Sequence, residues 1–505
     1  MQPRSPKTFT TRVASEGLLN VFKSLLLLGI AAVSTPIIIR TIGGANYGLL
    51  ALAISVTGYV ALAEFGIQTE VSRQVAKLGS TTRQVNESVA KGFWTLLFHA
   101  SIAFLVLAGV FFSRRTLFHS LRPAEYHSFD TSFLILGVSF CVSLPGLACL
   151  GYLTGSGQVR LASSIQVVSR LLAASTSVLL VLLGHGAPGA SAGLAVGMIF
   201  TSTLALVAVL AERGPACIRP PTQFRRMAKK SPENVTLFTW MAAMTLISGA
   251  DPIVVSLTAH DDLGSYALAS QLNILAILVL GAVFVPLVPA LAARSTPNDQ
   301  QMLATLHRLS TAGIFSLGTT LMFLAPNVLP LLGGASLGAA ATSAGLLLLV
   351  ATMIRQVPAP LALHALNSDQ HKVTRAAAVV EALINLPASL MLGFRFGSIG
   401  VALGTLAGAL SSVLFYAFAG FPRETLGSRN SRFWVASTLK ATAALLPFVL
   451  LAVVLRSPSN LAPRLALVPV ACLTLCFVAL ERNDRALLLS IPESMSPWRT
   501  PPAEQ

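Results

Sequence analysis

The chain is a succession of apolar runs, each about as long as a lipid bilayer is thick. A helix needs about 20 mostly apolar residues to cross the hydrocarbon core. Only 11% of the residues are charged and 54% are hydrophobic, whereas soluble domains carry about 25% charged residues. No water-soluble fold covers this much apolar surface, so the sequence predicts an all-α, polytopic membrane protein.

We count fourteen such runs and expect each to form a transmembrane helix. They cover residues 17–40, 46–66, 91–113, 131–155, 160–184, 190–211, 234–258, 265–293, 305–328, 338–366, 371–395, 398–421, 431–455 and 461–480.

The placement of Lys and Arg predicts the orientation of these helices. With the N-terminus inside, the segments on the inner side carry 24 Lys and Arg residues and those on the outer side carry 7. Positive residues concentrate on the cytoplasmic side of membrane proteins. The bias therefore predicts a multi-pass membrane protein with both termini in the cytoplasm. The net charge of +16 is then a topology signal facing anionic lipid, and we expect no nucleic-acid partner.

No segment between the apolar runs is long enough for a soluble catalytic domain. The segments 67–90 and 212–233 are the longest inside, and 114–130 is the longest outside. The five cysteines form no C-x-x-C pair and lie mostly in apolar runs, where cysteine behaves as a small hydrophobe. We therefore expect no catalytic residues, no metal site and no disulfide framework, and a transporter rather than an enzyme.

A motif near the N-terminus occurs a second time after the basic segment 212–233. The stretch "STPIIIRTIGGANYG" (34–48) has a counterpart in "GADPIVVSLTAHDDLGSYALAS" (249–270). Both have a proline, an apolar triplet, and then a turn with Gly and Tyr. The matching positions are Pro36 and Pro252, Gly44 and Gly264, and Tyr47 and Tyr266.

Two further matches follow in the same order at nearly the same offset. They pair Pro145 with Pro360, Arg160 with Arg375, and the glycines 186, 189 and 193 with 397, 400 and 404. Six runs lie in each half and both halves begin inside, which is typical of parallel repeats. We expect two pseudo-symmetric six-helix lobes, 1–211 and 234–421, joined by a basic cytoplasmic linker, 212–233. Two extra helices and a cytoplasmic tail would occupy 422–505.

Residues 35–77 resemble the start of oligosaccharide flippases of the Wzx type, in the multidrug/oligosaccharidyl-lipid/polysaccharide exporter superfamily. The similarity lies in the Pro-to-Arg helix end, the Gly-x-x-x-Tyr-Gly that opens the second helix, "AEFGI", and the basic helix at Arg73–Lys77. The fourteen runs and the two-lobe layout extend it over nearly the whole chain. Glu64 stands where such proteins commonly have aspartate.

The resemblance implies a function and its partners. Such proteins move a polyprenyl-diphosphate-linked glycan from the cytoplasmic to the outer leaflet of the bacterial inner membrane, as two lobes rock in alternating access. The implied partners are the lipid-linked oligosaccharide, membrane lipids and other polysaccharide-assembly proteins. No cofactor is implied, apart from coupling to a proton or sodium gradient.

Charged residues deep in the predicted helices are the candidate functional groups, because charges at a helix centre cost at least about 2.5–3.5 kcal/mol. Arg170 lies ten residues into its run, roughly 15 Å deep, and Arg355 is similarly deep. Lys23 lies about 9 Å deep and can reach the inner interface. Each is a candidate contact for an anionic substrate, with a structural ion pair, or snorkelling for Lys23, as the alternative.

The repeat offset of 215 relates Gln166 to Glu381 and Arg170 to Asn385. Residues four apart share one helix face, so we expect the two faces to oppose each other across a cavity. Gln166 and Asn385 would contact substrate, while Arg170 and Glu381 would form a pair that breaks during transport. A static salt bridge is the alternative.

Glu381, Asp251 and Glu64 are the candidates for coupling to an ion. Asp251 precedes Pro252 near an outer helix end, where the alternative is a helix-capping role. Glu64 lies at an inner helix end, where a solvated interfacial role is the alternative.

Two other cargoes remain open. A cation-coupled multidrug exporter of the same fold would need acidic groups in its cavity, whereas here the deep cations outnumber Glu381. A lipid-II-type flippase for peptidoglycan precursors is closest in mechanism to the glycan flippase.

Overall fold

The computed structural model describes residues 6–78, 82–220, 232–284, 299–362, 371–418 and 421–480. Within these ranges every regular element is a helix and no strand occurs. The predicted all-α class is confirmed. Residues 221–231, which belong to the predicted linker, and the predicted tail from residue 481 lie outside the described residues.

The first half of the chain (residues 6–218) runs from the long N-terminal helix to a short turn of helix before the predicted linker. Its elements are α1 (Pro6–Gly58), η1 (Tyr59–Glu64), α2 (Ile67–Leu78), α3 (Thr82–Phe112), α4 (Arg114–Leu117), α5 (Pro123–Ser143), α6 (Gly146–Gly155), α7 (Val159–Leu180), η2 (Val181–His185), α8 (Gly186–Arg213) and η3 (Pro215–Ile218).

The second half (residues 232–480) begins with a helix that again contains a proline, Pro252. Its elements are α9 (Pro232–Thr258), η5 (His260–Asp262), α10 (Leu263–Phe284), α12 (Asp299–Gly333), α13 (Ala335–Gln356), α15 (His371–Phe418), α16 (Phe421–Val454), η6 (Pro458–Asn460) and α17 (Leu461–Ala479).

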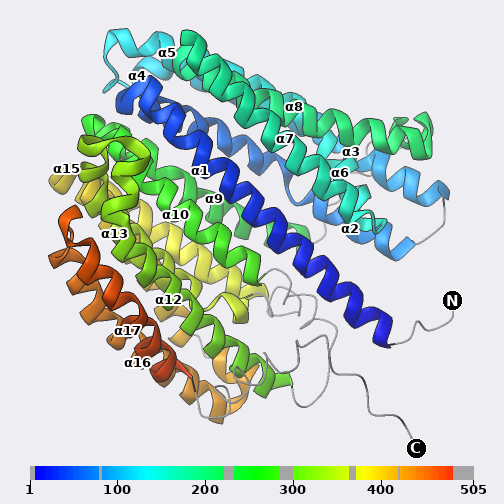
Figure 1. The fold of residues 1–505 in the computed structure, drawn as a ribbon. Coiled ribbons are helices and arrows are strands. Elements are labelled where there is room, and N and C mark those ends of the chain that lie inside the picture. The colour runs from blue at the N-terminus through cyan, green and yellow to red at the C-terminus, as the bar shows by residue number, and fades with distance from the viewer. Residues whose placement is uncertain are drawn as a thin grey trace, which may run out of the picture.

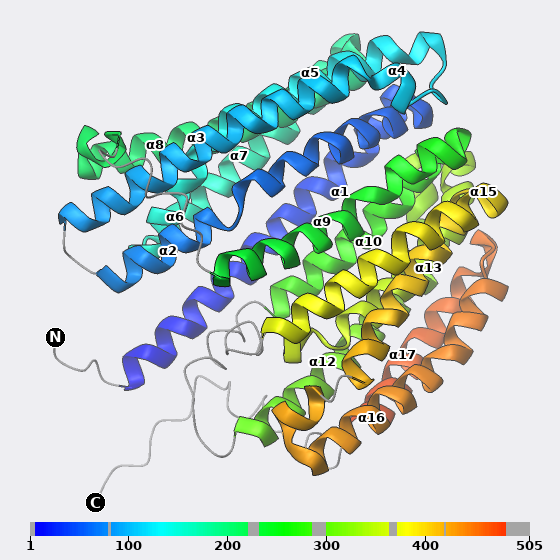
Figure 2. The ribbon, with the colours of Figure 1, turned by 180° about the vertical axis from the view of Figure 1, so that it is seen from behind.

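Long helices run side by side along the molecule, with α1 between the two halves (Figure 1). α1 packs against α5, α7 and α8 of its own half and against α9, α10 and α12 of the other. Seen from behind, the chain reverses within α1 and returns toward α2 (Figure 2). Gly43 interrupts the helix at this reversal, with φ 79° and ψ 161°.

Two other runs are interrupted in the same way. The continuous helical run 159–213 is broken at Gly184, and α15 is broken at Gly397. We call the end of the bundle that carries Gly43, α4 and η5 the outer end, following the predicted topology, and the opposite end the inner end.

Seven of the described helical runs are long and apolar enough to cross a membrane, or eight if the bent pair α5 and α6 counts as one crossing. Three of these seven, which contain the breaks at Gly43, Gly184 and Gly397, are 47 to 55 residues long. A helix of 50 residues is about 75 Å long, over twice the bilayer core of about 30 Å. All fourteen predicted runs fall at least partly on described helix. The exact number of crossings stays a prediction.

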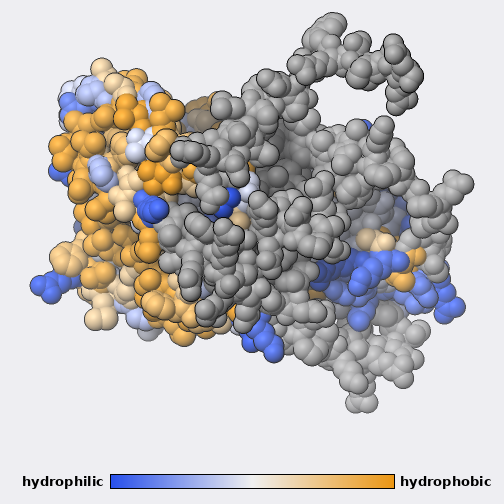
Figure 3. All heavy atoms as spheres, turned by 90° about the horizontal axis from the view of Figure 1, so that it is seen from below, coloured by the Kyte–Doolittle hydropathy of each residue, from blue (hydrophilic) through white to orange (hydrophobic). Residues whose placement is uncertain are grey.

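The last two helices, α16 and α17, lie on the outside of the second half and pack against α12 (Figure 1). They expose large apolar side chains, among them Leu446, Leu450, Leu473 and Phe477. Hydrophobic residues also cover much of the described surface seen from below (Figure 3). A surface of this kind is stable against lipid but not against water.

Arg464 is fully buried on α17. Its guanidinium donates to the carbonyl of Phe323 at 3.0 Å and to Asn327 Oδ1 at 2.5 Å, both on α12. It also donates to the carbonyls of Asn460 and Ser457. This side chain therefore fastens α17 to the second half.

Candidate functional site

Two helices of the first half bring three of the predicted substrate-binding residues together. Lys23 on α1 donates a hydrogen bond from Nζ to Gln166 Oε1 on α7. Arg170 lies one turn further along α7 and within electrostatic reach of the Lys23 ammonium. Two cations and an amide therefore share one region between α1 and α7.

The exposure of these side chains indicates what they face. Lys23 and Gln166 are half-buried, and Arg170 is exposed. Two of their neighbours on α7, Ile165 and Ser169, are buried against the protein. A guanidinium facing lipid at this depth is costly, so such charges usually face water or a partner. The arrangement suits a polar, anion-accepting space beside α1.

Glu381 has a different partner from the one expected. Its Oε1 accepts a hydrogen bond from Arg355 Nε at 2.5 Å, across the contact of α13 and α15. Arg170 belongs to the cluster on α1 and α7, so the expected pairing of Arg170 with Glu381 is corrected. The offset placed both residues at comparable depth, but depth does not say which helices are neighbours.

The Arg355–Glu381 pair is deeply buried and incompletely satisfied. The Glu381 side chain is 1% exposed and that of Arg355 is 17% exposed. Arg355 Nη2 and Glu381 Oε2 are buried without a hydrogen-bond partner among the described residues. Buried polar atoms of this kind are rare, and each raises the question of a missing water, ion or ligand.

Asn385, expected to face the cavity, is buried inside the hairpin of α15. Its Oδ1 accepts a hydrogen bond from Ser389 Oγ at 2.8 Å. A Cβ placed on Gly408 would lie only 2.7 Å from the Cβ of Asn385. In this structure Asn385 packs the hairpin together, while its predicted counterpart on the other half, Arg170, is exposed.

Asp251 is the centre of a second polar cluster in the same half. Its Oδ2 accepts hydrogen bonds from Tyr266 Oη at 2.7 Å and from Thr405 Oγ1 at 2.9 Å. The side chains come from α9, α10 and α15 and are buried. Arg355 lies within electrostatic reach of Asp251. Two predicted ion-coupling residues, Asp251 and Glu381, therefore belong to one buried region linked by Arg355.

Tyr59 connects this region to the first half. Its hydroxyl lies 3.6 Å from where a Cβ on Gly249 would stand, and the side chain is within electrostatic reach of Asp251. Tyr59 is on η1, and Gly249 and Asp251 are on α9. Neither Tyr59 nor Tyr266 was a candidate from sequence, although Tyr266 lies within the repeated motif.

Glu64 caps a helix. Its Oε2 accepts from the backbone N–H of Gly66 at 3.1 Å and its Oε1 from that of Gln68 at 2.6 Å, at the start of α2. A carboxylate is favourable at the N-terminus of a helix. Phe65, between them, has a left-handed backbone with φ 51°. An ion-coupling role for Glu64 stays a prediction.

Within the described ranges, no three His, Cys, Asp or Glu side chains lie close enough together to hold a metal ion.

No curated protein matches the chain in sequence, but solved structures match its fold. The chain is similar to lipid II flippase MurJ in an inward closed conformation, with 12% identity and a TM-score of 0.69, over 93% of this chain and 100% of that one. It is similar to an inward-facing MATE family multidrug resistance transporter of the MOP superfamily, with 14% identity and a TM-score of 0.62, over 84% and 99%. An outward-facing MATE family transporter of that superfamily gives 12% identity and a TM-score of 0.54, over 84% and 96%.

These likenesses establish the fold of a polytopic transporter, and the sequence itself supplies the family. Residues 18–294, more than half of the chain, match the family described as polysaccharide biosynthesis protein. The matched range includes the repeated motif in both copies and the cluster of Lys23, Gln166 and Arg170. This multi-pass membrane protein belongs to the polysaccharide biosynthesis protein family.

Proposed function

We propose that the protein flips a polyprenyl-diphosphate-linked oligosaccharide across the bacterial inner membrane by alternating access. Its glycan would serve surface polysaccharide or exopolysaccharide synthesis, including O-antigen of lipopolysaccharide. The two lobes, 1–211 and 234–421, rock about a central cavity, and both termini face the cytoplasm. The protein acts as a transporter and not as an enzyme.

The cationic cluster of Lys23 and Arg170 is the observation that carries this proposal. A diphosphate brings negative charge and several acceptor oxygens. Arg binds such groups bidentately, and Lys acts as a point charge. Gln166, already bonded to Lys23, can bind sugar hydroxyls or orient the ammonium. A site with two cations favours an anionic cargo over the cationic drugs of a multidrug exporter.

The buried region of Asp251, Glu381 and Arg355 is proposed as the coupling element. In a low-dielectric interior, a proton or sodium ion that binds a carboxylate strongly weakens its electrostatic attraction to Arg355. Tyr59 of the first half lies within electrostatic reach of Asp251 and could carry this change to the contact between the halves. The gradient that drives transport is expected to be one of protons or sodium ions.

A deletion strain tests the proposed cargo. Loss of surface glycan, with lipid-linked repeat units accumulating on the cytoplasmic side, is the expected phenotype. Drug hypersensitivity with normal glycan would point instead to the multidrug exporter. A lethal deletion that accumulates lipid-linked peptidoglycan precursor would point to the lipid-II-type flippase.

A further inference from the structure

The two halves meet closely at the outer end. A Cβ on Gly264, at the start of α10, would lie 2.2 Å from the carbonyl oxygen of Gly44 on α1, and one on Gly48 would lie 2.8 Å from the backbone nitrogen of Gly264. Gly44 and Gly264 are equivalent positions of the repeated motif. The halves therefore touch backbone to backbone at this end, with no room for side chains.

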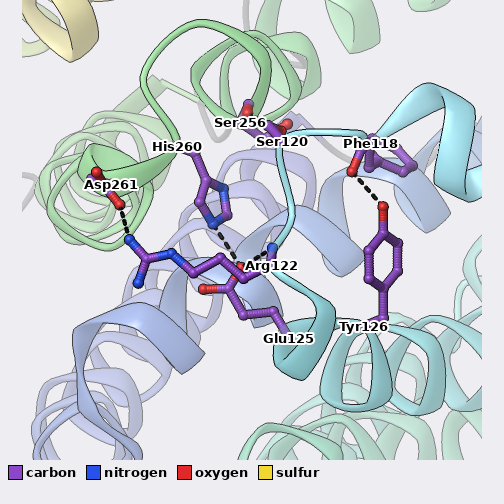
Figure 4. Close-up of polar contacts among 8 residues, drawn as sticks. All are labelled: Phe118, Ser120, Arg122, Glu125, Tyr126, Ser256, His260 and Asp261. Carbon is purple, nitrogen blue, oxygen red and sulfur yellow. Dashed lines mark hydrogen bonds and ion pairs between the residues drawn. The ribbon is translucent and has the colours of Figure 1, made fainter.

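Polar contacts surround this close approach. Hydrogen bonds of described residues join the first half to the second at the outer end. They run from Arg40 Nη2 to the carbonyl of Leu331, from Ser120 Oγ to the carbonyl of Ser256, from Arg122 Nη2 to Asp261 Oδ1, and between His260 Nε2 and Glu125 Oε2. Three of them connect the segment 120–125 with the segment 256–261 (Figure 4).

Glu125 is the shared acceptor of this cluster. Its Oε2 binds His260 Nε2 at 2.8 Å and also accepts the backbone N–H of Arg122 at 2.8 Å, which caps the start of α5. The carboxylate is thus oriented by its own helix before it contacts the other half. Figure 4 shows the His260 ring pointing from its loop toward Glu125.

The two side-chain contacts of the cluster differ in burial. The Glu125 and His260 side chains are 17% and 16% exposed, whereas those of Arg122 and Asp261 are 66% and 83% exposed. Exposed ion pairs contribute little, because water and salt screen them. Nearly buried partners lose much more when separated, because each leaves a polar group without its partner.

We propose that Glu125 and His260 form a latch that holds the outer end closed and sets how often the protein opens outward. The proposal deepens the proposed transport cycle and rests on it, since an outward-open state requires the segments 120–125 and 256–261 to separate. His260 Nδ1 is buried without a partner among the described residues. The latch is therefore incompletely satisfied, which suits a contact that must break in every cycle.

Ser256 offers a reporter for this opening. It is fully buried and its backbone carbonyl accepts the hydrogen bond from Ser120 of the first half, so Ser256→Cys should react with a membrane-impermeant maleimide only when the halves part. Labelling is measured in membranes without cargo. The labelling of the parent chain, which has five cysteines, is subtracted.

Glu125→Gln keeps an oxygen for the capping bond but removes the charge that holds His260. Glu125→Gln and His260→Gln, each made as a single substitution, should each raise the labelling rate by about tenfold. This is the population shift that follows loss of one hydrogen bond to a charged group. Arg122→Gln should raise the rate by no more than about fivefold, because its pair is exposed.

Glu87→Gln is the matched control. It removes one carboxylate of the same type from an exposed pair within α3, with Arg83, far from the latch. The labelling rate should not change. Folding of each variant is checked by its gel-filtration profile, and only folded variants are compared. Parent-like labelling of both folded latch variants would overturn the proposal.

A cross-link gives a second, independent measurement. Glu125→Cys combined with His260→Cys should be joined in membranes by a short bifunctional thiol reagent, whereas Glu87→Cys with His260→Cys should not. Failure of the first pair to cross-link would also overturn the latch. Neither measurement depends on the glycan, so the two proposals can fail separately. If the deletion strain keeps normal glycan while the latch variants still label faster, the proposed cargo is rejected and the latch stands.

Discussion

Gly186 and Gly397 have the same backbone conformation although 211 positions separate them in the chain. Their angles are φ 57° with ψ −145° and φ 62° with ψ −143°. Each allows a reversal between two packed helical segments, in a region of φ that glycine adopts without the strain of a Cβ. The third predicted repeat pair thus marks two hairpins with the same geometry.

The glycines that follow these turns make the same close contact in both hairpins, which gives the first prediction. A Cβ on Gly193 would lie 2.3 Å from the backbone nitrogen of Ser177, and one on Gly404 would lie 2.3 Å from that of Ser389. Gly193→Ala and Gly404→Ala should each cost about 1–3 kcal/mol, since backbone must shift to admit the methyl group. Thermal unfolding of the purified protein measures both.

Gly313→Ala is the control for this pair. Nothing lies within 4 Å of the added Cβ, and the residue is inside α12. The substitution should leave stability unchanged or raise it by up to about 1 kcal/mol, because alanine favours the helix. Equal unfolding temperatures for all three variants would contradict the close packing of the two hairpins.

The buried pair of Arg355 and Glu381 gives the second prediction. Glu381→Gln leaves the guanidinium without a negative partner, so the protein should lose about 3–5 kcal/mol of stability. The double variant Arg355→Met with Glu381→Leu should recover most of this loss, because apolar side chains of similar volume often replace a buried pair without cost. The measurement is again the midpoint of thermal unfolding.

A transport assay of the double variant distinguishes a structural role of this pair from a role in coupling. If the pair couples transport to an ion, the stable double variant should fail to restore surface glycan in the deletion strain. Restored glycan would make the pair a purely structural element and would remove Glu381 from the coupling residues.

Arg464 gives the third prediction. Arg464→Ala removes the hydrogen bonds that a buried guanidinium donates to the carbonyl of Phe323 and to Asn327 Oδ1, and a hydrogen bond from a charged group contributes about 1.5–3 kcal/mol. Arg464→Lys should lose nearly as much, because an ammonium cannot reproduce the planar fork of a guanidinium. Unfolding temperatures of the two variants measure the loss.

Arg456→Ala serves as the comparison, since Arg456 is exposed just before the same helix. It should unfold at the temperature of the parent protein. A lysine variant at position 464 as stable as the parent would show that charge alone, and not the geometry of the guanidinium, holds α17.

The sequence predicted the helices well because bilayer length and hydropathy leave little choice. It also named Lys23 and Arg170 as separate candidate contacts for an anionic substrate because both lie within predicted helices, and the structure brings them within electrostatic reach of each other. It failed for Arg355 and Glu381. Hydropathy and the repeat offset give depth along a helix, whereas contact between α13 and α15 depends on how the helices are arranged around one another.

Arg464 also shows that contacts between helices cannot be predicted from local sequence. Its burial depends on acceptors supplied by α12, more than a hundred residues earlier. No local pattern in the sequence of α17 indicates those acceptors.

The cluster of Lys23, Gln166 and Arg170 gives the last prediction, and it tests the cargo site directly. Lys23→Ala and Arg170→Ala should each abolish most glycan export while leaving the unfolding temperature near that of the parent, because Arg170 is exposed, Lys23 is only half-buried, and neither is in an ion pair among the described residues. Lys440→Ala, which removes an exposed lysine from α16, should leave export intact. Arg170→Lys should restore part of the export if charge is sufficient and none if bidentate binding of a diphosphate is required. Normal export by both alanine variants would exclude this cluster as the site that binds the anionic cargo.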